Sequence, residues 1–227
     1  MTKQTYNTIE TFMLNHMDNS AHDKHHIDRV LNAAVDIACH ETNVDMDVLV
    51  AACLLHDIGR GAQEENPALC HAEVGAEMAY EFLTAEGWQA QKARHVAACI
   101  FTHRYRNDRP PRTLEAKILF DADKLEACGV IGIARTLIYA GQCGEPLYII
   151  DEKGRLQEER RDPQKSSFMG EYNFKLKNVY DVFYTTHAKK LAKTRQKDAE
   201  NFYRSLFTEV TENYKNGKKL SEVMKWQ

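Results

Sequence analysis

The chain has 227 residues, enough for one substantial domain or for a domain with an extension. Hydrophobic residues make up 43% and charged residues 28%, and the net charge of −3 argues against a broad nucleic-acid-binding surface. The N-terminus lacks the basic start and apolar run of a signal peptide, and no stretch approaches the ~20 apolar residues of a membrane-spanning helix. We therefore expect a cytoplasmic protein.

Long amphipathic stretches with few prolines and glycines predict an all-α fold. The third expected helix is almost wholly apolar ("VLVAACLL") and is therefore central, and it ends at Gly59. A polar loop, "RGAQEENPALC", follows it. The helices expected in the first 140 residues cover about 5–17, 26–41, 46–58, 70–86, 89–104 and 114–138.

The C-terminal part begins with a long polar insertion at 141–170, in which we expect a short hairpin. Loops of this length are commonly lids or binding loops. Two further helices, at about 171–191 and 193–216, are expected to close the chain. The sequence thus predicts a domain over 1–140 and, over 141–227, a lid-like loop with C-terminal helices that pack on the same core.

The six cysteines are scattered, and no two of them form a C-x-x-C pair. Four of them, Cys39, Cys53, Cys99 and Cys128, lie in apolar helical contexts that are typical of buried free thiols. This usage indicates a reduced protein without structural zinc.

Polar residues interrupt the apolar helices at three places. His56 and Asp57 end the central helix, and His26 lies on the apolar stripe of the helix before it. Asp121 and Asp123 lie in the mostly apolar stretch "ILFDADKLEACGVIGIAR". Burying a carboxylate is costly unless it is paired or binds a metal. Two imidazoles with two carboxylates form a donor set suited to Mn, Fe, Co, Ni or Zn, and also to Mg.

The two aspartates point in opposite directions, because residues two apart on a helix are rotated by about 200°. Asp123 shares its face with Leu119, Phe120 and other apolar residues, which favours it modestly as the inward-facing carboxylate. Asp121 is then expected to support the site from behind or to pair with a lysine.

The segments "HDKHHIDRV", "LLHDIGR" and "ILFDADKLEACGVIGIAR", in this order, resemble the HD-domain superfamily of metal-dependent phosphohydrolases. The last segment is similar to a small bacterial branch of that superfamily. The resemblance implies an HD-domain helical bundle with a C-terminal helical extension. It also implies that His26, His56, Asp57 and Asp123 bind a divalent metal ion.

His71 and His103 lie between the HD pair and the last aspartate. Some branches of the superfamily place two histidines there and hold a second metal, whereas in others such histidines contact the substrate. The sequence leaves open a second metal, contact with a phosphate or transfer of a proton, and a purely structural role.

The resemblance implies hydrolysis of a small phosphorylated substrate, most readily a nucleotide, by a water that the metal activates. Asp57 would orient that water, while Arg60 and Lys124, whose positions the motifs fix, would stabilise charge on the phosphoryl oxygens. Arg60, Lys124, His71 and His103 therefore join Asp57 as candidate catalytic residues.

Two alternative functions stay open. An HD-type di-iron oxygenase needs six protein ligands, and His71 and His103 would supply the last two. A non-catalytic, metal-dependent nucleotide sensor would use the same ligands without turnover. The tyrosine-rich tail "VYDVFYTTHAKKL" is a candidate homodimer interface under any of these functions.

Overall fold

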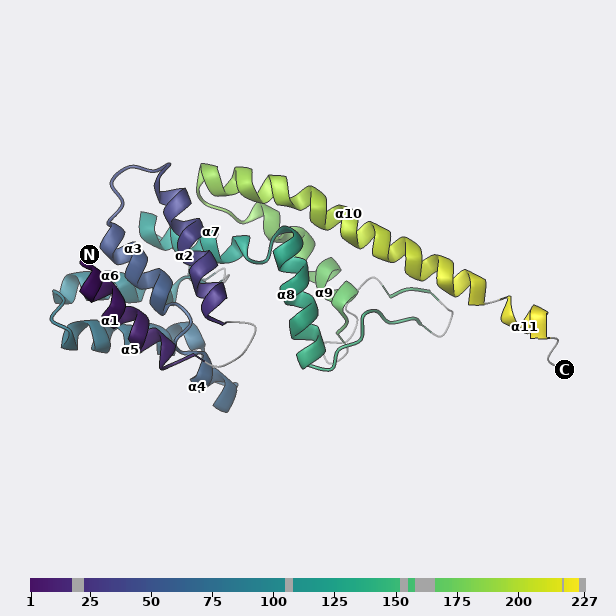
Figure 1. The fold of residues 1–227 in the computed structure, drawn as a ribbon, viewed down its shortest axis with the longest axis horizontal. Coiled ribbons are helices and arrows are strands. Elements are labelled where there is room, and N and C mark those ends of the chain that lie inside the picture. The colour runs from purple at the N-terminus through teal and green to yellow at the C-terminus, as the bar shows by residue number, and fades with distance from the viewer. Residues whose placement is uncertain (18–22, 105–107, 152–154, 158–165, 218, 225–227) are drawn as a thin grey trace. The chain divides into compact units, whose positions relative to one another are not determined.

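The computed structural model describes residues 1–17, 23–104, 108–151, 155–157, 166–217 and 219–224. The regular secondary structure in these ranges is helical and includes no strand (Figure 1), so the expected all-α class is confirmed. One isolated antiparallel bridge joins Ile150 to Leu156, within the segment for which a hairpin was predicted. Residues 152–154 and 158–165 of that segment lie outside the described residues.

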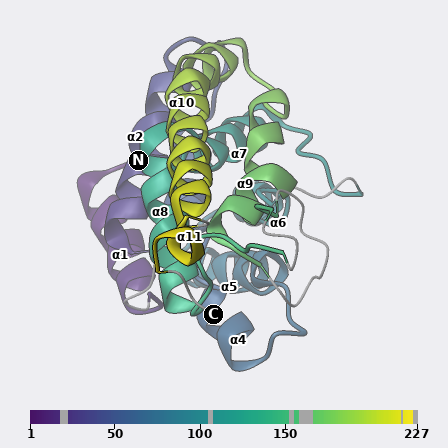
Figure 2. The ribbon, with the colours of Figure 1, turned by 90° about the vertical axis from the view of Figure 1, so that its right-hand side faces the viewer.

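The chain forms two compact units, and the first comprises residues 1–126 and 183–190. In this unit α3 packs against α1, α2, α6 and α7, and α5 lies beside α6 (Figures 1 and 2). Seven side chains of α3 are buried, which confirms its central place. The helices of this unit are α1 (Lys3–Leu14), α2 (Lys24–Ala38), α3 (Met46–Leu55), α4 (Arg60–Glu65), α5 (His71–Ala85), α6 (Ala90–Phe101) and α7 (Leu114–Leu125).

Side-chain caps set the first residues of α2, α3 and α7. Asp23 accepts a hydrogen bond from the backbone N–H of His26, and Thr113 accepts one from the N–H of Ala116. Asp45 caps α3 by accepting from two backbone N–H groups. Each cap satisfies donors that a helix start leaves without an intrahelical partner.

The second unit comprises residues 127–182 and 191–227. Aromatic side chains fill its interior: the rings of Tyr172 and Tyr203 stack with centroids 3.6 Å apart, and Phe168 packs on Tyr203 at 5.2 Å. Its elements are α8 (Gly129–Gln142), α9 (Phe168–Phe174), the 3₁₀ helix η1 (Leu176–Asp181), most of α10 (Thr186–Gly217) and α11 (Leu220–Met224).

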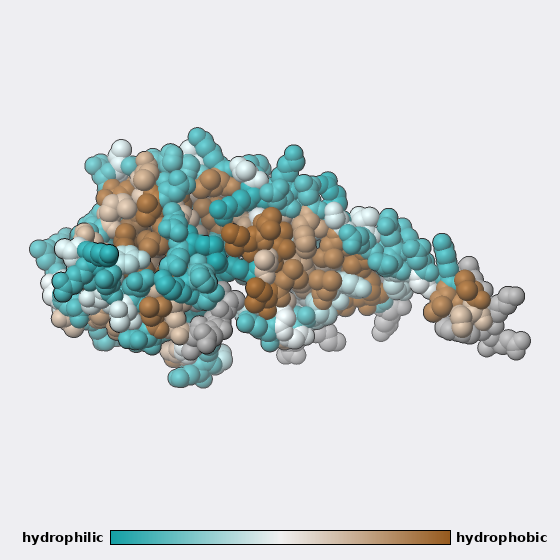
Figure 3. Space-filling view, in the orientation of Figure 1, coloured by the Kyte–Doolittle hydropathy of each residue, from teal (hydrophilic) through white to brown (hydrophobic). Residues whose placement is uncertain are grey.

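The surface of α8 carries apolar side chains, visible as the brown area over this helix in Figure 3. Val130 is 65% exposed and Ile138 is 56% exposed. The predicted homodimer stays a prediction, as does the predicted division of the chain at residue 140.

None of the helices in the described ranges combines the length and apolar character that crossing a bilayer requires.

The helix predicted over 114–138 is wrong, because the structure breaks it into α7 and α8. Glu126 caps the end of α7, and Gly129 has a φ of 65°, a left-handed conformation that cannot continue the helix. The apolar periodicity nevertheless runs through the break, since residues on both sides of it are buried.

Two other predicted segments also differ from the structure. The predicted helix over 171–191 is replaced by α9, η1 and a non-helical stretch that ends where α10 begins. In that stretch the backbone N–H groups of Tyr184 and Thr185 bond to the carboxylate of Asp121, so they are not available to a helix. The predicted polar loop after Gly59 contains the short helix α4.

Candidate metal centre

Six residues that were predicted to form the site lie together in the first unit. His26 lies in the first turn of α2, His56 and Asp57 follow the last residue of α3, and His71 begins α5. His103 lies just beyond α6, and Asp123 lies in the last turn of α7. The four imidazoles and Asp57 are buried, with at most 5% of each residue exposed.

Each of the four imidazoles directs its Nδ1 atom at a carbonyl, amide or carboxylate oxygen, which accepts a hydrogen bond. Nδ1 therefore carries the proton in each ring, and Nε2 carries a lone pair. The partners are Glu126 Oε2 for His26 at 3.2 Å, the Cys53 carbonyl for His56 at 2.8 Å, Gln63 Oε1 for His71 at 2.6 Å and the Ile100 carbonyl for His103 at 2.6 Å.

The Nε2 atoms then face one another in two pairs. The Nε2 atoms of His26 and His56 are 3.3 Å apart, and those of His71 and His103 are also 3.3 Å apart. Two lone pairs at this distance cannot form a hydrogen bond, but both can bind the same cation. Neutral imidazoles oriented by hydrogen bonds at the opposite ring nitrogen are the usual form of histidine metal ligands, so the donor set fits a divalent metal.

The carboxylate of Asp57 lies between the two pairs. Its Oδ2 atom is 3.6 Å from the Nε2 atoms of His26 and His56, and its Oδ1 atom is 3.6 Å from those of His71 and His103. Both oxygens are buried without a hydrogen-bond partner. Such orphaned carboxylate oxygens are costly without a cation, which is a second indication that the site is built for metal.

Asp123 completes the first pair. Its Oδ1 atom is 3.7 Å from Nε2 of His26, and one donor atom each from His26, His56 and Asp123 lies within 4.8 Å of the other two. Asp57, His71 and His103 form a second triad by the same measure. The structure therefore brings together all four residues predicted as metal ligands, and also places His71 and His103 beside them.

The electrostatics keep these groups in the protonation states that bind metal. Burial lowers the pKa of His56 to about 4 and that of His71 to about 2. Burial alone would raise the pKa of Asp57, but the imidazole of His56 and the guanidinium of Arg60 hold it well below its usual range. The pKa of Asp123 is likewise held well below its usual range against burial, chiefly by the ammonium of Lys124.

The two predicted catalytic cations lie beside the cluster. Nε of Arg60 is 2.8 Å from Oδ2 of Asp57, at ion-pair distance but without hydrogen-bond alignment. Nζ of Lys124 is 2.8 Å from Oδ2 of Asp123. Their side chains are 29% and 17% exposed, so a molecule arriving from solvent meets them before it meets Asp57.

Two residues that orient the imidazoles were not predicted from the sequence. Glu126 is buried and its Oε2 atom accepts from His26 and from Nε of Arg29, which lies 2.8 Å away. Gln63, in α4, accepts from His71. Glu126 follows Asp123 by three positions and therefore shares its helix face, a spacing that could have identified it.

Asp121 was predicted to support the site from behind or to pair with a lysine, and its carboxylate instead accepts three hydrogen bonds from Tyr184 and Thr185. Asp121 is fully buried and accepts from the N–H of Tyr184 at 2.9 Å, and from both the N–H and the hydroxyl of Thr185 at 2.7 Å. Burial nevertheless raises its pKa, while Lys189 acts only as a nearby positive charge. Both aspartates therefore face protein: Asp123 faces the imidazoles and Asp121 the start of α10.

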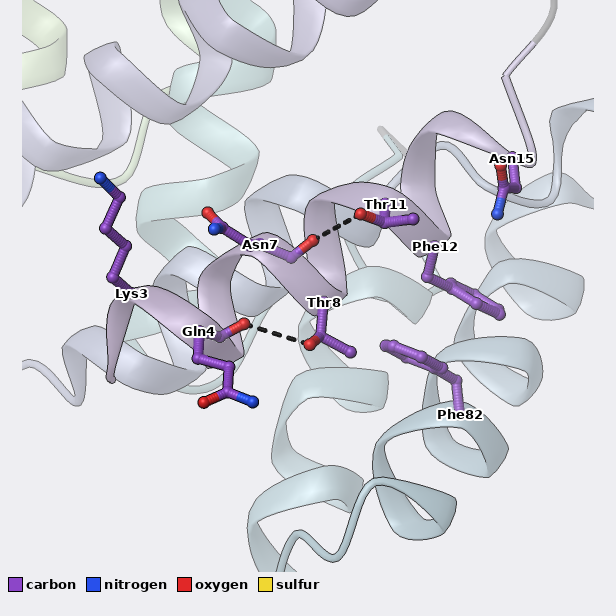
Figure 4. A pocket seen from close by; sticks show the side chains of 8 residues that line it. All are labelled: Lys3, Gln4, Asn7, Thr8, Thr11, Phe12, Asn15 and Phe82. Carbon is purple, nitrogen blue, oxygen red and sulfur yellow. Dashed lines mark hydrogen bonds between the residues drawn. The ribbon is translucent and has the colours of Figure 1, made fainter.

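A groove along α1, shown in Figure 4, lies elsewhere and has different chemistry. Phe12 and Phe82 stack at its edge with ring centroids 3.8 Å apart. The hydroxyls of Thr8 and Thr11 donate to backbone carbonyls of the same helix. No carboxylate or imidazole is among the described residues that line this groove, so these residues do not form a second hydrolytic site.

Comparison with known proteins places these motifs in a family. Residues 24–128 match the HD domain. The uncharacterized protein YpgQ of Bacillus subtilis is 27% identical over 194 residues, which are 85% of this chain and 86% of YpgQ.

Solved structures give the same result. The crystal structure of YpgQ in complex with ADP matches with a TM-score of 0.69 and 27% identity, over 90% of this chain and 97% of that chain. An HD-superfamily hydrolase from Bacillus thuringiensis matches with a TM-score of 0.68 and 26% identity, over 91% and 97%. A predicted HD superfamily hydrolase from an uncultured Thermotogales bacterium matches with a TM-score of 0.60 and 28% identity, over 91% and 92%.

Proposed function

Residues 24–128 match the HD domain, and on this premise we propose that the chain is a metal-dependent phosphohydrolase of the HD-domain superfamily. Its reaction is the cleavage of a phosphoester or phosphoanhydride bond of a nucleotide by water. The observation that carries the proposal is the buried carboxylate of Asp57, which has no hydrogen-bond partner and lies between two pairs of imidazole lone pairs.

The residues that would hold metal follow from this arrangement. His26, His56, Asp57 and Asp123 would bind one divalent ion, and His71, His103 and the other oxygen of Asp57 would bind a second. A bound divalent ion supplies Lewis acidity, which makes water a stronger nucleophile at neutral pH and polarises a phosphoryl oxygen.

The protein itself contributes orientation and charge. Glu126 and Gln63 fix the rings of His26 and His71 through their Nδ1 protons, so the donor atoms need no rearrangement before the reaction. Arg60 and Lys124 are positive, partly exposed and adjacent to ligand carboxylates. They are placed to bind the phosphate chain and to stabilise the charge that develops on its oxygens.

The choice of a nucleotide substrate is supported by the relative YpgQ, whose crystal structure contains ADP. A diphosphate chain carries the kind of charge that Arg60 and Lys124 complement. Release of phosphate and release of pyrophosphate both begin with attack of water on phosphorus, so the identity of the product distinguishes a phosphatase from a pyrophosphohydrolase.

The test is hydrolysis of a panel of nucleoside mono-, di- and triphosphates by protein supplied with Mn²⁺, Co²⁺, Ni²⁺ or Mg²⁺, with identification of the products. We expect turnover of at least one nucleotide, loss of turnover in Asp57→Ala, and full turnover in Asp198→Ala, which removes an exposed aspartate of α10. No hydrolysis of any phosphate compound with any of these metals would refute the proposal. Nucleotide binding without turnover would instead indicate the sensor.

A di-iron oxygenase is the second candidate, and a specific observation favours it. His26, His56, Asp57, His71, His103 and Asp123 together supply six protein ligands in two triads joined at one carboxylate. Iron-dependent oxygen consumption without phosphate release would support this alternative. Nucleotide hydrolysis under strictly anaerobic conditions would argue against it.

A further inference from the structure

A second cluster of metal-binding side chains lies on the surface of the same unit. Asp36 is in the last turn of α2, His40 lies two residues beyond the end of that helix, and His187 is the second residue of α10. One donor atom from each residue lies within 4.8 Å of the other two. Asp36 follows His26 by ten residues, about 15 Å of helix rise, so the two clusters are separate.

The contacts within this cluster join elements that are far apart in the sequence. Nε2 of His187 is 2.8 Å from Oδ2 of Asp36, a hydrogen bond that an ion bound to both groups would replace with release of the ring proton. The rings of His40 and His187 stack with centroids 3.6 Å apart. Nδ1 of His40 is 2.9 Å from the backbone carbonyl oxygen of Asp36, which can only accept. His40 therefore carries its proton on Nδ1 and presents a lone pair at Nε2, as a metal ligand does.

The position of His187 is fixed by the core of the unit. The carboxylate of Asp121, in α7, holds the backbone of Tyr184 and Thr185 immediately before α10. The hydroxyl of Thr185 also accepts from the N–H of Ala188, at 3.4 Å. Because α7 packs against α2, this anchoring holds His187 close to Asp36 before any ion arrives.

We propose that Asp36, His40 and His187 form a binding site for a transition-metal ion of the Zn²⁺ or Ni²⁺ type. A donor set of two imidazoles and one carboxylate binds Zn²⁺ or Ni²⁺ more readily than it binds Mg²⁺ or Ca²⁺. The side chain of Asp36 is 52% exposed and that of His187 is 19% exposed, so the ion would enter from solvent and keep positions for water. The bound ion joins the end of α2 to the start of α10 and stabilises this contact.

The experiment measures how many equivalents of Zn²⁺ the full-length protein binds, by calorimetric titration and by metal analysis after dialysis, and repeats both with Ni²⁺. The test variant is His40→Ala/His187→Ala. The matched control is His16→Ala, because His16 also bonds through Nδ1 to the carbonyl of the residue four positions earlier but belongs to no cluster of ligands among the described residues.

We expect the wild-type protein and His16→Ala to bind one equivalent more than the double variant. We also expect Zn²⁺ to raise the Tm of wild-type protein by more than it raises the Tm of the double variant. Asp36→Asn, which keeps the side chain's shape, should weaken the same binding event, and circular dichroism would establish that each variant is folded. Equal stoichiometry and affinity in the wild type and a folded double variant would overturn the proposal, as would an equal loss in His16→Ala. Metal stoichiometry is measured without substrate, so failure of the proposed hydrolysis would leave this result unaffected.

Discussion

The replacement Glu126→Gln tests whether the hydrogen bonds behind the imidazoles set the affinity for metal. Oε2 of Glu126 is 3.2 Å from Nδ1 of His26, and Nε and Nη2 of Arg29 each lie 2.8 Å from the same oxygen. The side chain of Glu126 is only 5% exposed, so solvent screens these contacts little. Glutamine keeps the size of the side chain but removes its charge and turns an N–H₂ group toward donors.

The magnitude follows from the change in hydrogen-bond type. Bonds to charged groups are worth about 1.5–3 kcal/mol and neutral ones about 0.5–1.5, so His26 loses roughly 1–2 kcal/mol of orientation and basicity. Since 1.4 kcal/mol is a factor of ten, we expect metal affinity to fall by about 5- to 30-fold. This agrees with the 10- to 100-fold loss typical of such supporting residues.

The assay is competition for metal with a chromophoric chelator at neutral pH. The matched control is Glu115→Gln, which removes the charge of another buried glutamate, at the opposite end of α7. Glu115 accepts from the backbone N–H of Asp45 and lies 3.1 Å from Nε2 of His95, outside the cluster. Unchanged metal affinity in Glu126→Gln, or an equal loss of affinity in Glu115→Gln, would show that the hydrogen bonds behind the imidazoles do not set the affinity for metal.

Three further predictions concern stability. Asp121→Ala should lower the free energy of unfolding by about 2–4 kcal/mol in urea titrations, because it leaves two buried donors and one half-buried donor without their acceptor. A loss below 1 kcal/mol would contradict this. Gly59→Ala should lower the free energy of unfolding by about 1–3 kcal/mol, since the added Cβ would lie 2.3 Å from the carbonyl oxygen of His71. In the control Gly141→Ala the added Cβ meets no atom within 4 Å, so this change should leave the free energy of unfolding unchanged or raise it slightly. In metal-free protein, His56 and His71 have pKa values below the usual 6.5, so the unfolded state binds more protons than the folded state at mildly acidic pH. The free energy of unfolding should therefore fall as the pH drops from about 6.5 toward 4. Equal unfolding free energies at pH 7 and pH 5 would contradict that prediction.

The residues that cluster in the candidate metal centre could be predicted from the sequence because each lies next to a distinctive local pattern. His56 and Asp57 follow a helix with seven buried side chains, and Asp123 lies in an apolar stretch, so the carboxylates of Asp57 and Asp123 each require a cation. The spacing alone did not indicate that Asp57 lies between two pairs of imidazoles. That arrangement depends on how α3, α5 and α6 pack, which local periodicity does not determine.

The partners of Asp121 could not be predicted for a similar reason. Helix geometry correctly gives opposite directions for Asp121 and Asp123, but the N–H groups that donate to Asp121 come from Tyr184 and Thr185, more than sixty residues later. The break between α7 and α8 was also missed, because apolar periodicity reports burial and continues through a turn. Gly129, whose left-handed φ makes the turn possible, was the local indication of that break.

The central claim is that the cluster around Asp57 uses metal to hydrolyse nucleotides. Its most direct test is product release from a panel of nucleoside phosphates under strictly anaerobic conditions, with metal-loaded wild-type protein, Asp57→Ala and Asp198→Ala. We expect phosphate or pyrophosphate release by the wild type and by Asp198→Ala, and none by Asp57→Ala. Absence of hydrolysis with every metal, or hydrolysis that survives Asp57→Ala, would contradict it.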